Sequence, residues 1–256
     1  MTTHPEMTSG TATAASGRAR APFVLGAPEG WPRVMGIVNV TPDSFSDGGI
    51  LFDADRAAEA ALRMEEAGAD LVDIGGESTR PGSDPVDVDE ELRRVMPVIG
   101  KIRARSGVAI SIDTRRAAVA RAALAAGAGM VNDVSALRHD PEMAGVVREA
   151  GVPVVLMHMR GEPKTMQQEI RFDRVVGEVR AELEERHAAA LAAGIDRAQV
   201  LIDPGIGFGK TFDHNLELLA HLEAFTDIAP VVVGASRKAF IGHLTGKPAG
   251  PGRAAG

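Results

Sequence analysis

The sequence predicts an α/β fold of the (β/α)8 barrel type, and three observations support that prediction. Short apolar stretches rich in Val, Ile and Leu alternate with longer amphipathic stretches along the chain. The short stretches lack a strict period of two, which is typical of parallel strands covered on both faces. Polar side chains follow each short stretch, and barrel enzymes place their functional residues at the carboxyl ends of the strands.

Seven strands are expected, and all of them are short. They cover residues 34–40, 70–75, 108–113, 130–133, 152–158, 200–203 and 230–235. Each is followed by a helical pattern, so the chain is built from βαβ units with right-handed crossovers. We therefore expect about seven of the eight units of a barrel, with the eighth missing from this chain.

Amphipathic helices are expected between the strands, over residues 54–67, 89–105, 116–126, 141–150, 173–193 and 214–224. Glycine follows several of them directly, as at Gly68, Gly127, Gly151 and Gly194. This is the usual left-handed ending of a helix. Asp213 precedes the sixth helix and is a candidate N-cap.

A doubly wound sheet of the Rossmann type is the alternative fold. It should carry G-x-G-x-x-G after the first strand, but here that strand ends in NVTPDS. The later glycine-rich stretch, DPGIGFGKT, is not a Walker A loop, because Pro204 stands where the first glycine is required. We favour the barrel, and we interpret this stretch as a turn that presents Phe208 to a ligand.

The composition is that of a soluble globular protein, with 256 residues, 45% of them hydrophobic and 25% charged. The net charge of −7 gives no basic patch for nucleic acid. The absence of cysteine excludes disulfides, thiolate metal sites and cysteine nucleophiles. No apolar run approaches the roughly 20 residues of a membrane helix, and residues 1–22 lack the apolar core of a signal peptide. We expect a disordered tail over 1–22, a single barrel domain over 23–256, and a cytoplasmic location.

Carboxylates and amides at the strand ends are the candidate site residues. Asp113 and Asp203 would repel each other in one pocket unless a heterocycle with several N–H donors lay between them. Salt bridges to Arg115 or Lys238 are the alternative for these two aspartates. The amides of Asn39 and Asn132 both donate and accept hydrogen bonds. They suit a heterocycle edge or an oxygen-seeking cation such as Mg²⁺, and turn chemistry is the structural alternative.

Two further loops carry unusual polar groups. Arg237 and Lys238 stand at the start of a helix, where they oppose the helix dipole and indicate an anionic or electron-rich ligand. The segment STRPG, residues 78–82, combines a hydroxyl, a guanidinium and a rigid proline. The seven histidines show no metal-binding spacing, and we interpret them as structural or surface residues, with His158 as a possible exception.

These stretches together resemble the dihydropteroate synthase family of pterin-binding barrels. The matching segments are MGIVNVTPDSFSDGG, DIGGESTRPG, SIDT, VNDVSAL, LMHMRGEPKTMQ, DPGIGFGKT and GASRKAFIG, which lie within residues 35–242. The resemblance implies a transferase of folate biosynthesis and a target of sulfonamides. In that reaction 4-aminobenzoate attacks the methylene of 6-hydroxymethyl-7,8-dihydropterin diphosphate, pyrophosphate leaves, and 7,8-dihydropteroate forms.

The resemblance also implies a role for each candidate residue. Asn39 would be the Mg²⁺ ligand, and Asp113, Asn132 and Asp203 would bind the pterin edge. Lys238 would reach the pterin carbonyl, and with Asp113 it is a catalytic candidate. Thr79, Arg80 and Pro81 would form a mobile loop, with Thr79 on the diphosphate. Phe45, Pro81, Phe208 and Lys238 would line the aminobenzoate pocket.

One departure from the family pattern concerns the end of the sequence. The family continues with a helix and an eighth strand that carries an Arg-Val-His-Asp type motif, whereas this sequence ends in GKPAGPGRAAG. We expect a C-terminally truncated sequence whose full-length form is a homodimer. Two alternatives to the synthase stay open: a catalytically impaired pterin-binding paralogue or fragment, and a methyltetrahydrofolate-binding methyltransferase domain.

Overall fold

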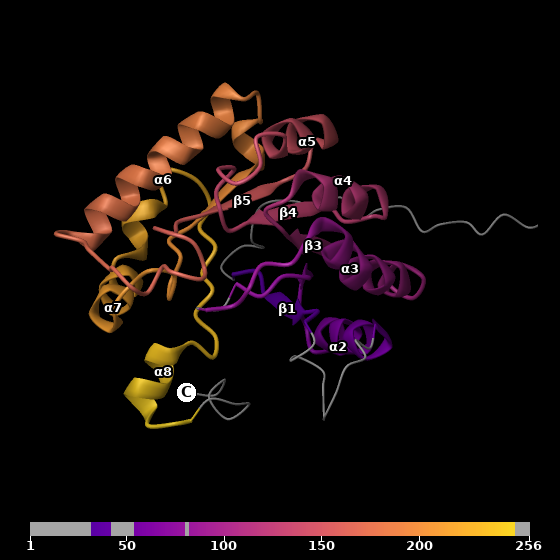
Figure 1. The fold of residues 1–256 in the computed structure, drawn as a ribbon, viewed down its shortest axis with the longest axis horizontal. Coiled ribbons are helices and arrows are strands. Elements are labelled where there is room, and N and C mark those ends of the chain that lie inside the picture. The colour runs from indigo at the N-terminus through magenta and orange to yellow at the C-terminus, as the bar shows by residue number, and fades with distance from the viewer. Residues whose placement is uncertain (1–31, 42–53, 80–81, 249–256) are drawn as a thin grey trace, which may run out of the picture.

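The computed structural model describes residues 32–41, 54–79 and 82–248, and it forms one parallel sheet flanked by helices (Figure 1). The strands are β1 (Met35–Asn39), β2 (Leu71–Gly75), β3 (Ala109–Asp113), β4 (Met130–Asp133), β5 (Val154–Met157) and β6 (Val200–Asp203). They pair in sequence order, and every pair is parallel. The α/β barrel-type architecture is therefore confirmed, as are the first six predicted strands.

The predicted seventh strand is reduced to a bridge between Ile202 and Val231. Ile202 N donates to the carbonyl of Pro230 at 3.0 Å, and Val232 N donates to the carbonyl of Ile202 at 2.8 Å. Val233 is already 38% exposed. The extended pairing that we predicted over 230–235 is therefore wrong in its length. The next hydrogen bond of this parallel ladder would come from the backbone N–H of residue 204, but β6 ends at Asp203 and Pro204 has no N–H, so the ladder ends after two hydrogen bonds.

The helices are α2 (Ala54–Glu66), α3 (Val88–Arg103), α4 (Ala117–Ala125), α5 (Met143–Ala150), α6 (Val175–Ala192), α7 (Phe212–Ala220) and α8 (Ala239–Thr245). Helices α2 to α5 follow one another along the outer face of the sheet (Figure 1). None of the described helices is both long enough and apolar enough to cross a membrane.

Helix α7 begins earlier than we predicted. Its N-cap is Thr211, whose hydroxyl accepts from His214 N at 3.2 Å, while the His214 ring accepts from Thr211 N at 3.3 Å. This reciprocal arrangement satisfies two free amides of the first turn, which makes it a capping box. Asp213 is therefore not the cap but a residue of the first turn, and the helix ends at Ala220 rather than Ala224.

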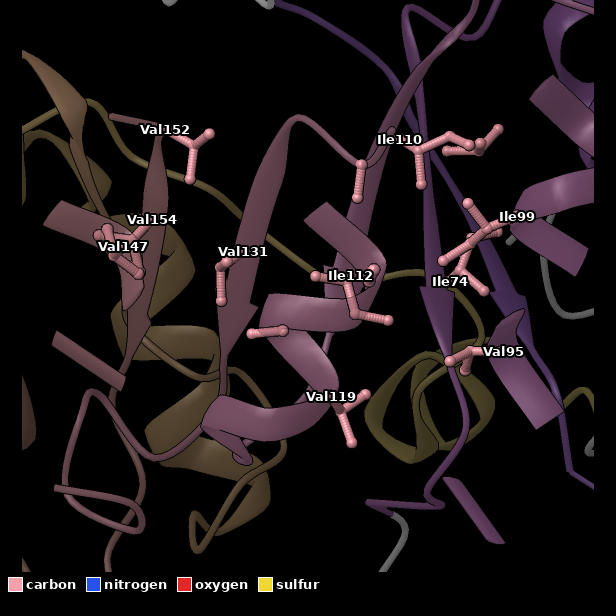
Figure 2. Packing of buried hydrophobic residues seen from close by; sticks show 14 of the residues in the cluster. Ile74, Val95, Ile99, Ile110, Ile112, Val119, Val131, Val147, Val152 and Val154 are labelled. Carbon is pink, nitrogen blue, oxygen red and sulfur yellow. The ribbon is translucent and has the colours of Figure 1, made fainter. Parts of the chain in front are cut away.

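The main core lies between the sheet and α2 to α5. Figure 2 shows Ile74, Ile110 and Ile112 from the strands among side chains such as Ile99 of α3 and Val119 of α4. The inner face of the sheet carries a second, smaller layer that includes Leu71, Met130, Val155 and Leu201.

Side chains alternate between the two faces of a strand, and this alternation positions the site. Asp73, Asn132 and Asp203 each stand two residues beyond an inner-face apolar residue, namely Leu71, Met130 and Leu201. The inner face of the sheet therefore changes from apolar to polar toward the carboxyl ends of the strands.

Candidate active site at the strand ends

Two carboxylates, the buried Asp73 and the half-buried Asp113, occupy the polar end of the inner face. Asp73 is 3% exposed and accepts a hydrogen bond from Asn132 Nδ2 at 2.9 Å. Burial raises the pKa of Asp73. Burial also raises the pKa of Asp113 well above its usual value, and the charge of Asp73 adds to that shift. The two carboxylates have few hydrogen-bond donors and, among the described residues, no positive charge beside them. A ligand that supplies N–H groups or a developing cation would therefore stabilise their ionised forms.

Asp113 and Asn132 lie beside each other in the sheet, where they are register partners on β3 and β4. On the other side of Asp113, Gly75 is its register partner on β2. A Cβ atom on Gly75 would lie 3.2 Å from Asp113 Oδ2, so only glycine leaves the carboxylate its space without a tight contact.

The salt bridge that we considered between Asp113 and Arg115 is wrong. Arg115 points its guanidinium away, with Nη2 at 2.6 Å from Glu77 Oε1 and Nη1 at 2.7 Å from Glu162 Oε2. No ion pair involves Asp113 in the described part of the chain. Its carboxylate is therefore held among other acids, not neutralised by a neighbouring guanidinium.

Asp203 ends β6 and begins the glycine-rich turn. Its Oδ1 accepts from Gly205 N at 2.6 Å. Gly205, Gly207 and Gly209 have φ angles of +67°, +83° and +61°, which L-residues with side chains adopt at a cost. A Cβ on Gly205 would lie 1.9 Å from the carbonyl oxygen of His158, because the turn rests directly on the end of β5. The turn is confirmed, and its shape requires the glycines.

Three side chains fix this turn and the phenylalanine on it. Asn215 Oδ1 accepts from Gly207 N at 2.6 Å, and Lys210 Nζ donates to the carbonyl of Phe208 at 3.0 Å. Lys238 donates to the carbonyl of Ile206, and its Nζ lies 4.6 Å from the centre of the Phe208 ring. Phe208 and Lys238, predicted to share a pocket wall, are therefore in contact.

Asp203 and Lys238 influence each other electrostatically. Burial raises the pKa of Asp203, and the charge of Lys238 opposes that rise. Burial lowers the pKa of Lys238 to about 8, and the charge of Asp203 opposes that fall. The two groups attract, although the recorded hydrogen bond of Lys238 goes to a backbone carbonyl. This end of the site therefore offers an acid and a base that a polar ligand could bridge.

Beneath the turn, Lys210 and His158 form a buried pair that the sequence analysis missed. Lys210 Nζ lies 2.9 Å from His158 Nδ1, and His158 Nε2 lies 3.1 Å from Glu182 Oε2 on α6. Burial lowers the pKa of His158 to about 4, so its ring is neutral at pH 7 and accepts at Nδ1 while donating at Nε2. His158 is a structural residue, and it ties the site to α6.

Lys210 gives the protein a testable dependence of stability on pH. Burial lowers its pKa to about 7, whereas a lysine in an unfolded chain titrates near ~10.4. Between these values the unfolded chain binds more protons, so the free energy of unfolding rises with pH, by at most about 1.4 kcal/mol per unit. Lys210→Met removes this contribution. We would measure the free energy of unfolding of both proteins in urea at pH 7, 8 and 9. We expect the difference, parent chain minus variant, to increase as the pH rises. Parallel pH curves would contradict the burial of a titrating amine.

Of the other predicted site residues, Asn39 and Thr79 belong to the described part of the chain. Asn39 is exposed at the end of β1, where its register partner is Gly75. Thr79 is half-buried, four residues beyond β2. Phe45, Arg80 and Pro81 lie outside the described residues. Within the described ranges, no group of three or more His, Asp or Glu side chains could hold a metal ion.

Comparison with known proteins gives a consistent family. Residues 35–255 match the family model described as pterin binding enzyme. A dihydropteroate synthase of Bacillus subtilis is 46% identical over 216 residues, covering 84% of this chain and 73% of the relative. A probable bifunctional folylpolyglutamate synthase/dihydropteroate synthase of Haloferax volcanii is 49% identical over 223 residues. That match covers 87% of this chain but only 26% of the longer relative.

Solved structures agree with the sequence comparison. The dihydropteroate synthase of Xanthomonas albilineans with 4-aminobenzoic acid is 53% identical to this chain. It superposes with a TM-score of 0.82, over 88% of this chain and 80% of the relative. The same enzyme in complex with 7,8-dihydropteroate superposes with a TM-score of 0.78. This chain therefore belongs to the pterin binding enzyme family, among the dihydropteroate synthases.

Proposed function

We propose that this chain condenses 6-hydroxymethyl-7,8-dihydropterin diphosphate with 4-aminobenzoate and releases pyrophosphate and 7,8-dihydropteroate. The observation that carries the proposal is the donor-poor group formed by the buried Asp73 and the half-buried Asp113 and Asn132. A pterin ring supplies the N–H donors that such a group needs. The X. albilineans relative, which is 53% identical to this chain over the aligned region, has been solved with 4-aminobenzoic acid.

The reaction makes one bond and breaks one bond at the pterin methylene. The C–O bond to the diphosphate breaks, the aniline nitrogen forms the new C–N bond, and that nitrogen gives up a proton. An aniline is neutral at pH 7, so the step needs no strong base. The difficulty lies in the positive charge at the methylene, and we propose that the Asp113 carboxylate stabilises this charge electrostatically. Asp113, Asn132 and Asp203 would hold the pterin edge, and Lys238 its carbonyl.

The amine would bind beside Phe208 and Lys238. Lys238 is a cation that lies over the Phe208 ring, and burial holds its pKa at about 8. This combination suits a flat aromatic ring that carries a carboxylate. Phe45 and Pro81 stay predicted residues of this aminobenzoate pocket. Thr79 and Arg80 stay predicted residues of the loop that would contact the diphosphate. A cytoplasmic location and a homodimer also remain predictions.

Asn39 is the residue that we propose for Mg²⁺. An exposed amide oxygen at a strand end fits a cation that takes oxygen ligands and binds mostly through substrate phosphates. When bound, the cation would neutralise charge on the diphosphate. We expect EDTA to abolish turnover and added Mg²⁺ to restore it. We expect Asn39→Ala to need at least about tenfold more Mg²⁺ for half-maximal rate, because even the loss of a group that only supports a metal ligand lowers metal affinity about 10–100-fold. An unchanged Mg²⁺ requirement in this variant would remove Asn39 from the role.

The proposed activity can be tested by incubating the chain with pterin diphosphate, 4-aminobenzoate and Mg²⁺ and assaying pyrophosphate release. Release that requires both substrates supports the synthase. Pterin binding without release supports the impaired pterin-binding protein. Methyl transfer from methyltetrahydrofolate supports the methyltransferase domain.

A further inference from the structure

We propose that residues 160–168, here called the strap, hold Phe208 in position for amine binding by tying it to the segment that carries Thr79. The identity of the amine rests on the proposed function. The strap follows β5 and precedes α6, two sets of contacts attach it to neighbouring segments, and a third set folds it on itself and holds its start to α6. The positioning residues in this proposal are Arg115, Glu162 and Gln167.

The first attachment joins the strap to the segment after β2. Arg115 bridges Glu77 and Glu162 at 2.6 and 2.7 Å. The side chains of Arg115 and Glu77 are each 7% exposed, whereas that of Glu162 is 65% exposed. The buried Glu77 therefore fixes the position of Arg115. The exposed Glu162 attaches the strap to this fixed guanidinium. Removing the Glu162 carboxylate should loosen this attachment of the strap without disturbing the buried pair.

Two further contacts join the same segments. Gly82 N donates to the carbonyl of Pro163 at 3.3 Å, and Lys164 Nζ lies 2.6 Å from Asp84 Oδ1. The described residues 77–79 and 82–84 are therefore connected to residues 162–164 at three points. These segments are far apart in the sequence, and both lead away from carboxyl ends of the strands.

The second attachment joins the strap to the glycine-rich turn. Met166 shares an apolar cluster with Phe208, and Gln167 Nε2 donates to the carbonyl of Gly207 at 3.1 Å. A Cβ on Gly209 would lie 3.0 Å from the carbonyl oxygen of Arg160 and 3.3 Å from that of Met166. The strap and the turn thus approach closely, main chain against main chain, where a small displacement of one must move the other.

The third set of contacts consists of hydrogen bonds within the strap and an ion pair that holds its start to α6. The carbonyl of Glu162 accepts from Thr165 N at 2.9 Å and from Met166 N at 2.7 Å, which folds the strap on itself. At its start, Arg160 Nη2 lies 2.8 Å from Glu178 Oε2 on α6. Because the two ends of the strap are connected by this folded turn, a change at Glu162 is transmitted to Phe208.

A double-mutant cycle tests this coupling. We expect Glu162→Gln to raise the KM for 4-aminobenzoate about threefold, the scale of a partly exposed ion pair, with kcat and the KM for the pterin diphosphate unchanged. Gln167→Ala cuts the other end and should have a similar effect, and the double variant should be no worse than either single variant. Additive effects, or an unchanged KM for the amine, would overturn the proposal. Glu185→Gln is the matched control, because it removes the same charge from an exposed pair with Arg186 on α6.

A second readout needs no activity and separates this proposal from the proposed function. Phe208 N donates to the carbonyl of Gly205 at 3.0 Å, so its hydrogen exchange reports on the order of the turn. We expect faster exchange over residues 203–211 in Glu162→Gln, and no change in Glu185→Gln. If the parent chain shows no turnover but this exchange difference appears, the strap stands and the enzymatic proposal fails. Equal exchange in both variants overturns the strap.

Discussion

Asp113→Asn is expected to lower kcat by about two to three orders of magnitude, the usual cost of losing a group that stabilises transition-state charge. The carboxylate is half-buried at the end of β3, and burial together with the charges of Asp73, Glu91 and Asp133 raises its pKa. A cation developing at the pterin methylene is the partner that this arrangement lacks. Asparagine keeps the shape and an accepting oxygen but removes the negative charge, so pterin binding should survive while turnover is lost.

The same substitution should not destabilise the protein. A buried acid whose pKa is raised costs folding free energy when it is ionised, and asparagine removes that cost. We therefore expect Asp113→Asn to unfold at the same urea concentration as the parent chain, or at a higher one. Asp227→Asn is the control, because it makes the same change from carboxylate to amide at an exposed residue paired with Arg180. Full turnover in Asp113→Asn would refute the role given to this carboxylate.

Gly205→Ala is expected to have the largest effect on stability, a loss of about 2–4 kcal/mol in the free energy of unfolding. The added methyl would lie 1.9 Å from the carbonyl oxygen of His158, and this oxygen is main chain that cannot rotate away. The φ angle of +67° adds the cost of a left-handed L-residue. Relief requires the turn to move off β5, which would carry Asp203 and Phe208 with it.

Urea unfolding checks this expectation, with Gly100→Ala as the control. Gly100 lies inside α3, and a Cβ there would meet no atom within 4 Å. We expect that variant to gain about 0.5–1 kcal/mol, because alanine is the better helix former. If Gly205→Ala unfolded at the same urea concentration as the parent chain, the close approach of the turn to His158 would be wrong.

The fold was largely predictable because its signals are local. Six apolar stretches became strands, and the glycine at Gly151 ends α5 in a left-handed conformation as expected. The seventh stretch is just as apolar, but its pairing with β6 stops where Pro204 has no N–H to donate, and apolar composition does not report that limit. We predicted the start of α7 two residues too late, because Thr211 and Asp213 are both plausible N-caps by residue type. The structure uses Thr211, which forms a reciprocal capping box with His214.

The positions of Asp113, Asn132 and Asp203 at strand ends were predictable from the sequence, and their roles in binding stay predictions. Contacts with partners distant in the sequence were not predictable. The lysine in GFGKT was visible, but its contact with His158, 52 positions away, was not. Arg115 illustrates the same limit, since its two acids lie 38 and 47 positions away and left Asp113 without the partner that sequence proximity suggested. Phe45, Arg80 and Pro81 stay predictions.

The central claim is that this chain forms the C–N bond between the pterin methylene and the amine. The most direct measurement uses 4-aminobenzoate labelled with ¹⁵N, pterin diphosphate and Mg²⁺, followed by mass spectrometry of the pterin products and quantitation of pyrophosphate. We predict dihydropteroate that carries one ¹⁵N, formed in equal amount with pyrophosphate, and almost none of it from Asp113→Asn. Pyrophosphate release with an unlabelled hydroxymethyl pterin as the product would contradict the account.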